Sequence, residues 1–121
     1  MALYLGLDSS TQSLTAVVLE MDGARRRVVL EHSLAFDEAL PTYATRHGVL
    51  PSDDPLVAEA PPAMWAEALD LVLSQLRDRG LDLAHVRAIA GSAQQHGSVY
   101  LATGAGARLS ALDPARPLAQ Q

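Results

Sequence analysis

The sequence contains no cysteine and no lysine, and all nine of its basic residues are arginine. Without cysteine the chain can form no disulfide, no thiolate zinc site and no cysteine nucleophile. Without lysine it has no P-loop lysine, no Schiff base and no lysine general base. Any chemistry must therefore come from carboxylates, hydroxyls, amides, imidazoles or the backbone.

Long apolar runs are also missing, since no stretch approaches the roughly 18 to 20 residues of a membrane-spanning helix. The opening segment MALYLGLDSS lacks the basic head and the cleavage site of a signal peptide. We therefore expect a cytoplasmic protein with no membrane partner. The formal net charge of -5 disfavours a nucleic-acid partner, because phosphate binding needs a basic surface.

The chain has 121 residues, which on the usual scale of roughly 100 to 200 residues per domain allows a single domain. Hydrophobic residues make up 49% of it and charged residues 19%, as in globular proteins. We expect a folded domain with a substantial apolar core.

Three β-rich runs open the chain, and short turn-forming segments separate them. They are LYLGLD at 3–8, LTAVVLE from Leu14, and a third run from Arg26 to Phe36. The pair Asp22-Gly23, between the second and third runs, is favoured in two-residue hairpins. The pattern predicts three consecutive antiparallel strands.

A proline-rich, irregular segment is expected from 37 to 62, and a long helix follows it. The helix should begin at Pro61 or Pro62, because proline suits the first turn, and end at Gly80. Apolar residues recur at intervals of three and four along it, which predicts one buried face: Trp65, Ala68, Leu69, Val72, Leu73 and Leu76.

Two further β-like runs follow the helix, one from Val86 and one from Gly97. Beyond Thr103 the chain shows no sustained period, so we expect a loop and a frayed end. Three antiparallel strands, a long helix and further strands indicate an α/β layer fold in which the helix covers one face of the sheet.

The first polar loop, DSSTQS at 8–13, offers groups suited to a phosphate and its metal. Asp8 follows a strand and could attract a hydrated magnesium ion, while hydroxyls, amides and main-chain N–H groups could donate to phosphate oxygens; these come from Ser10, Thr11, Gln12 and Ser13. The alternative is an ordinary polar hairpin loop, since Asp and Ser are frequent in turns.

The second polar loop, AGSAQQHG at 90–97, carries amides and an imidazole after a β-like run. Gln94, Gln95 and His96 can donate and accept hydrogen bonds, which suits a polyhydroxylated ligand. The alternative is structural, with Gln95 and His96 capping or bridging strands.

Taken together, three motifs in this order resemble the N-terminal part of the FGGY carbohydrate kinases: LGLDSSTQSLTAVVLE, PPAMWAEALDLVL and IAGSAQQHGSVYL. The resemblance covers nearly the whole chain. It implies that residues 1–121 form an incomplete N-terminal domain of the actin-like, ribonuclease-H-like kind. It also implies ATP and Mg²⁺ as cofactors and a small sugar as substrate.

The resemblance further implies a role for each loop residue. Asp8 would act through water on the magnesium ion, and Thr11 with its neighbours Ser10, Gln12 and Ser13 would approach the phosphates of ATP. Gln95 and His96 would bind sugar hydroxyls, and they favour a ketose such as D-xylulose, phosphorylated on its 5-hydroxyl. Ser10 departs from the family, where glycine is common. Because Ser10 has a Cβ, its backbone should not need a positive φ.

The catalytic Asp of this family is expected beyond Gln121, so no catalytic base is assigned within the chain. Asp8 cannot replace it, because positive charge beside a carboxylate weakens it as a base. The chain alone should therefore be inactive. Alternatives are a ribulose or glycerol kinase of the same family, another actin-fold ATPase, and a non-catalytic interaction module. Apolar surface left uncovered in an incomplete domain should favour self-association, so a homo-oligomer is also expected.

Overall fold

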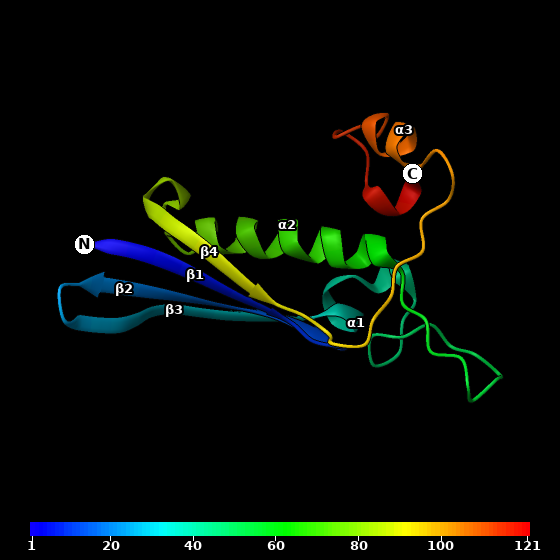
Figure 1. The fold of residues 1–121 in the computed structure, drawn as a ribbon, viewed down its shortest axis with the longest axis horizontal. Coiled ribbons are helices and arrows are strands. Elements are labelled where there is room, and N and C mark those ends of the chain that lie inside the picture. The colour runs from blue at the N-terminus through cyan, green and yellow to red at the C-terminus, as the bar shows by residue number, and fades with distance from the viewer.

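The first three strands form an antiparallel sheet, as the sequence predicts (Figure 1). The computed structural model describes residues 1–121, and its strands β1, β2 and β3 span Ala2–Ser9, Ser13–Asp22 and Arg25–Ala35. The hairpin between β2 and β3 differs from the expectation by one position. Asp22 still pairs with Arg25, so the loop is Gly23-Ala24, in which Gly23 takes the positive φ of 56°.

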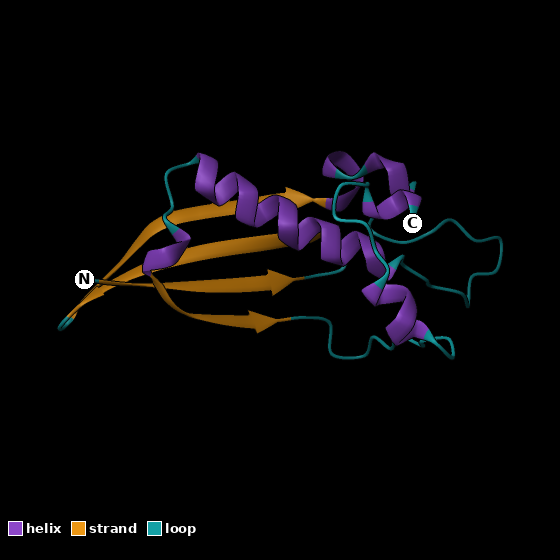
Figure 2. Ribbon diagram, turned by 90° about the horizontal axis from the view of Figure 1, so that it is seen from above, coloured by secondary structure: helices purple, strands orange, loops and turns teal.

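Strand β4, Val86–Ser92, joins the other side of β1 and gives the sheet order β3-β2-β1-β4. β4 runs parallel to β1, which requires a crossover connection. The helix α2 lies in that crossover and covers one face of the sheet (Figure 2). The α/β class expected from the sequence is confirmed. Because β1 and β4 are parallel, their carboxyl ends lie at the same edge of the sheet.

Helix α2 spans Pro62–Asp78, close to the predicted limits. Pro62 occupies its first turn, where no backbone N–H partner is needed. At the other end Gly80 has φ +95°, its N–H donates to the Arg77 carbonyl, and the N–H of Leu81 donates to the Leu76 carbonyl. This is a Schellman motif, and it returns the buried Leu81 to the core.

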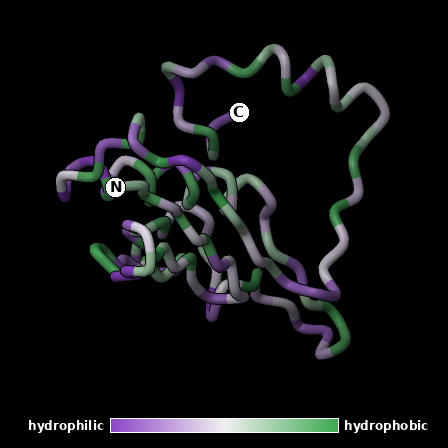
Figure 3. Tube along the Cα trace, turned by 60° about the vertical axis from the view of Figure 1, so that its left-hand side comes forward, coloured by the Kyte–Doolittle hydropathy of each residue, from purple (hydrophilic) through white to green (hydrophobic).

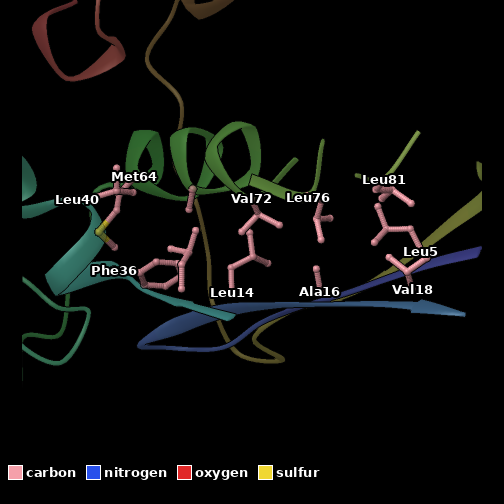
Figure 4. Close-up of a cluster of buried hydrophobic side chains, with 12 residues drawn as sticks. Leu5, Leu14, Ala16, Val18, Phe36, Leu40, Met64, Val72, Leu76 and Leu81 are labelled. Carbon is pink, nitrogen blue, oxygen red and sulfur yellow. The ribbon is translucent and has the colours of Figure 1, made fainter. Parts of the chain in front are cut away.

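The core is one layer of apolar side chains between α2 and the sheet (Figure 4). The helix contributes a stripe at intervals of four residues, Met64, Ala68, Val72 and Leu76, all fully buried. Each large apolar side chain buried here stabilises the fold by roughly 1.5 to 3 kcal/mol. The remaining buried apolar residues come from the strands and connections: Leu5, Leu14, Ala16, Val18, Leu34, Phe36, Leu40 and Leu81.

The predicted buried face of the helix needs two corrections. Leu69 is 39% exposed, and Met64, which the prediction omitted, is fully buried. The reason is that the helix meets the sheet along an i, i+4 stripe that starts at Met64, so Leu69 lies at its margin. Trp65 is half-buried beside the core.

The segment from 37 to 62 contains more regular structure than expected. Helix α1 spans Phe36–Ala39, and a single 3-10 turn follows at Pro41–Tyr43. The hydroxyl of Tyr43 donates to the Glu67 carboxylate of α2. Burial and this contact raise the pKa of Tyr43 well above its ordinary value, so the phenol stays protonated and ties the turn to the long helix.

The predicted strand from Gly97 to Thr103 is wrong. These residues form no regular structure and are exposed, including Tyr100 at 93% and Leu101 at 72%. A run of β-forming residues becomes a strand only when a neighbour pairs with it, and none pairs here.

The expected frayed end is also partly ordered, because α3 spans Ala105–Ser110 and a 3-10 turn spans Leu118–Gln120. A further 3-10 turn, Leu83–His85, precedes β4. Figure 3 shows the part of the chain after β4 leaving the sheet and looping outward before it reaches the C-terminus. No helix has the length and apolar character needed to span a membrane.

Candidate functional site

The two polar loops predicted from the sequence meet at one edge of the sheet, beyond the carboxyl ends of β1 and β4. Asp8 and Ser92 are register partners, and the Ser92 hydroxyl donates to Asp8 Oδ1 over 2.6 Å. The Gln94 amide donates to the Ser10 carbonyl over 3.5 Å. Parallel pairing of the strands therefore places the acidic loop beside the amide-rich loop.

The first loop is a tight turn that is shorter than the predicted segment, because Asp8 and Ser13 belong to strands. The N–H and the hydroxyl of Ser10 both donate to the Ser13 carbonyl, at 2.9 and 3.2 Å. Ser10 does not have a positive φ, which confirms that a side chain is tolerated there. Thr11 and Gln12 are exposed at the tip.

A second turn presses against the backbone of this loop. Arg46 and Val49 close a two-residue turn in which His47 and Gly48 have φ of 53° and 79°. Gly48 is buried, and a Cβ on it would lie 1.8 Å from the Thr11 carbonyl oxygen. Only glycine permits this approach, so Gly48 fixes how closely the turn packs on the loop.

The Asp37 carboxylate, in the only turn of α1, holds that second turn in place. It accepts hydrogen bonds from the Thr45 hydroxyl at 2.7 Å and from the N–H groups of His47 at 2.6 Å and Gly48 at 3.1 Å. These bonds, that of Thr45 foremost, lower the pKa of Asp37 below its ordinary value. The residue before it, Phe36, donates its N–H to the Gln12 carbonyl at 2.9 Å.

A cavity of about 1040 Å³ lies between the loops. Thr11 and Gly48, from the first loop and the turn packed on it, line it together with Gln95 and His96 of the second loop. Trp65, at the start of α2, contributes to its wall. The cavity thus brings together a hydroxyl from the first loop and the amide and imidazole of the second, as a polar ligand requires.

A smaller cavity of about 350 Å³ adjoins the first and is lined mainly by apolar side chains. Trp65 lines both cavities, and its indole Nε1 is buried without a hydrogen-bond partner. Leu69, at the margin of the core, also lines the smaller cavity.

Asp8 is the only acidic side chain of either polar loop, and the structure contains no group of three or more His, Asp or Glu residues that could hold a metal ion. A single carboxylate fits magnesium better than a metal that needs an all-protein cage. Mg²⁺ keeps several waters and is held by one or two carboxylates together with substrate phosphates. Ser92 occupies Oδ1 of Asp8, and no protein group donates to Oδ2.

All the residues predicted for the two loops lie at this edge, but several that shape it were not predicted. Ser92 and Gly48 contact the first loop directly, and Asp37 acts through the turn that contains Gly48. The only local signal for this turn was Gly48, because glycine readily adopts the positive φ that a turn requires. Its position against Thr11 depends on tertiary packing that no local pattern reveals.

Comparison with known proteins finds relatives among the xylulose kinases. The xylulose kinase of Mus musculus is 44% identical over 117 residues, which are 97% of this chain and 21% of that protein. Xylulose kinase 2 of Arabidopsis thaliana is 41% identical over 122 residues, covering 99% of this chain and 21% of that protein. The xylulose kinase of Saccharomyces cerevisiae is 43% identical over 110 residues, covering 91% of this chain and 18% of that protein.

Structural comparison gives only a distant likeness. The Aquifex aeolicus PPX-GPPA enzyme aligns with a TM-score of 0.45 and 10% identity, over 76% of this chain and 26% of that chain. So distant a likeness indicates nothing about the chemistry. No family model matches the chain. The identities to the mouse, plant and yeast proteins nevertheless extend over at least 91% of it, so the chain is a homologue of the xylulose kinases that spans about a fifth of their length.

Proposed function

We propose that the chain is the N-terminal segment of an ATP-dependent sugar kinase that transfers the γ-phosphoryl group of ATP to the 5-hydroxyl of a ketose, D-xylulose. In this proposal residues 1–121 are an incomplete actin-like domain of a carbohydrate kinase. The observation that carries it is the meeting of the two polar loops around one cavity, in a chain 44% identical to a xylulose kinase.

The first loop is the phosphate side of the proposed site. Thr11 and Gln12 stand exposed at its tip, and the loop is held by the bonds between Ser10 and Ser13. A preformed turn can offer donors to phosphate oxygens without reorganising, which is the main contribution of a protein to phosphoryl transfer.

Asp8 would hold the magnesium ion through water, using the oxygen that Ser92 leaves unoccupied. When bound, Mg²⁺ neutralises charge on the β- and γ-phosphate oxygens and so stabilises the transition state. Ser92 contributes by fixing the orientation of the Asp8 carboxylate.

The second loop is the sugar side. Gln95 and His96 line the same cavity as Thr11. An amide and an imidazole supply both donors and acceptors, which match the hydroxyls and carbonyl of a ketose. A site that hydrogen-bonds each hydroxyl discriminates strongly against a sugar that lacks one, because its own polar groups are then left unpaired.

Neither loop contains a second carboxylate to accept the proton of the sugar hydroxyl. In the proposal that base belongs to a part of the kinase outside these 121 residues, and the chain alone has no turnover. Domain closure would then bring the base to the sugar and exclude water that could hydrolyse ATP.

The test uses the longer protein whose N-terminal segment is this chain. Phosphate transfer from labelled ATP is measured with D-xylulose, D-ribulose and glycerol, and sugar binding is measured by calorimetry. We expect selective transfer to D-xylulose and loss of its binding in His96→Ala, with the exposed His85→Ala as the matched control. Selective transfer to ribulose or glycerol would show that this compound, and not D-xylulose, is the substrate. Absence of any sugar binding would overturn the proposal.

A further inference from the structure

We propose that Asp37 is a positioning residue for the phosphate loop: its carboxylate holds the turn at 45–48 so that Gly48 fixes the backbone of Thr11. This inference rests on the proposed kinase function for its catalytic consequence. The positioning itself rests on contacts within the chain.

The first step is that the Asp37 carboxylate holds the turn at 45–48 by hydrogen bonds. One carboxylate accepts three hydrogen bonds, one from the side chain of Thr45 and two from the backbone at His47 and Gly48. An ionised carboxylate can accept them all, and such charge-assisted bonds are roughly twice as strong as neutral ones.

The backbone of this turn is strained, so it needs stabilising contacts to keep its conformation. Ala44 and His47 both have positive φ, 54° and 53°, which side-chain-bearing residues adopt only when the surroundings require it. The N–H of His47 donates to the Asp37 carboxylate, so this hydrogen bond stabilises the strained backbone at His47.

The second step is transmission from the turn to the phosphate loop. Gly48 packs on Thr11 so closely that a Cβ would meet the carbonyl carbon of Thr11 at 2.8 Å and the Cα of Gln12 at 3.2 Å. On the other side, the N–H of Phe36 donates to the Gln12 carbonyl. Asp37 is bonded to Gly48 and adjacent in sequence to Phe36, so it connects both supports of the loop.

The third step is catalytic. Phosphoryl transfer depends mainly on the position of the reactants, and a misplacement of about 1 Å can cost about 100-fold in rate. Loosening the turn would displace Thr11, which faces the cavity, while Gln95 and His96 lie on another loop. Loss of Asp37 should therefore reduce turnover more than sugar affinity.

Hydrogen exchange in the chain tests the positioning without any assay of activity. The variants are Asp37→Asn, in which one acceptor oxygen becomes a donor, and Asp82→Asn as the control, because Asp82 also accepts from a backbone N–H and a side chain but lies at the turn before β4. We expect Asp37→Asn to speed exchange of the Ser10 and Phe36 amides about tenfold or more, and Asp82→Asn to leave both unchanged. Unchanged exchange in Asp37→Asn would overturn the proposal.

Kinetics of the longer kinase test the consequence. Asp37→Asn should lower kcat by about 10- to 100-fold and change the KM for the sugar by less than about 3-fold. Thr45→Val, which removes one of the three donors, should show a weaker effect in the same direction, and Thr45→Ser, which keeps the hydroxyl, should restore the rate.

The outcomes separate this inference from the proposed function. If Asp37→Asn and Asp82→Asn lower kcat equally, Asp37 is merely structural and the inference is wrong. If Asp37→Asn does not fold, Thr45→Val and Thr45→Ser replace it in the test. A lower kcat in Thr45→Val that Thr45→Ser restores supports positioning, and an unchanged kcat in Thr45→Val contradicts it. If the unsubstituted protein transfers no phosphate to any sugar, the proposed function fails, while the exchange measurement still decides whether Asp37 positions the loop.

Discussion

Ser92 donates a hydrogen bond to Asp8 across 84 positions of sequence, and the two residues are partners in the parallel pairing of β4 with β1. This bond connects the end of β1, which leads into the first polar loop, to the end of β4, which leads into the second. The register of the sheet therefore sets the relative position of the two loops, and the hydrogen bond from the Gln94 amide to the Ser10 carbonyl adds a direct contact between them.

Under the proposed function, Asp8→Asn in the longer protein should lower kcat by about 100-fold or more, because a neutral amide would no longer attract the hydrated metal that would stabilise transition-state charge. Steady-state kinetics at several Mg²⁺ concentrations measure the effect. Asp22→Asn, at the opposite end of the sheet, is the control and should have the parent rate. An Asp8→Asn variant with the parent rate would remove Asp8 from the metal site.

Gly48→Ala should destabilise the chain by about 3 kcal/mol, since it combines backbone strain with a steric overlap at the Thr11 carbonyl. Gly23→Ala is the matched control. Gly23 also has a positive φ, but a Cβ there meets nothing within 4 Å, so only the strain cost of about 1 kcal/mol applies. Urea denaturation compares the two, and equal losses would contradict the close packing of Gly48 on Thr11.

Asp37 should make stability depend on pH in the acid range. Its pKa in the folded chain lies below the ordinary value of 3.8, chiefly because Thr45 donates to it. A carboxyl with a lowered folded pKa stabilises the fold above its ordinary pKa, and this contribution is lost as the pH falls through the folded value.

The stability difference between the parent chain and Asp37→Asn should therefore be constant from about pH 7 to pH 5 and shrink below about pH 4. Urea denaturation at a series of pH values measures it. A difference that stays the same at pH 3 would show that the ionised form of Asp37 is not what holds the turn.

Leu76→Ala should cost about 2 to 5 kcal/mol, because Leu76 is fully buried between α2 and the sheet. Leu69→Ala on the same helix should cost about 0.5 kcal/mol, as expected for a side chain at the margin of the core. Thermal and urea denaturation of both variants provide the comparison. A larger loss at Leu69 would contradict the observed orientation of the helix.

The chain alone should self-associate with increasing concentration. Val99, Tyr100 and Leu101 lie in an exposed segment outside the sheet, and contiguous exposed apolar side chains drive association. Sedimentation velocity should show larger species, and Leu101→Glu should reduce them. A monodisperse monomer at all concentrations would contradict this expectation.

The sheet and the long helix could be predicted because their signals are local. The apolar runs at the start of the chain, the proline at 62 and the glycine at 80 act through propensity and capping, so the three strands and α2 were found nearly to the residue. The strand expected from Gly97 failed because β structure needs a pairing partner, and no local pattern supplies one.

The same distinction applies to the site. Asp8, Thr11, Gln95 and His96 were identified by residue type and by their place after apolar runs, and they do lie at one edge of the sheet. Asp37 could not be found in this way, because its importance comes from three donors that reach it from a turn folded back onto α1. The residues next to Asp37 in the sequence do not indicate that these donors reach it.

The regular hydrogen bonding of β4 stops at Ser92, and the chain that follows makes no ladder bonds with the sheet. Changes in the length or composition of the loop after Ser92 therefore leave the strand pairing unchanged, although the hydrogen bond from Gln94 to the Ser10 carbonyl would be affected. Under the proposed function, the segment that would contact the sugar thus lies outside the regular strands, so its exchange would alter sugar specificity without rebuilding the sheet.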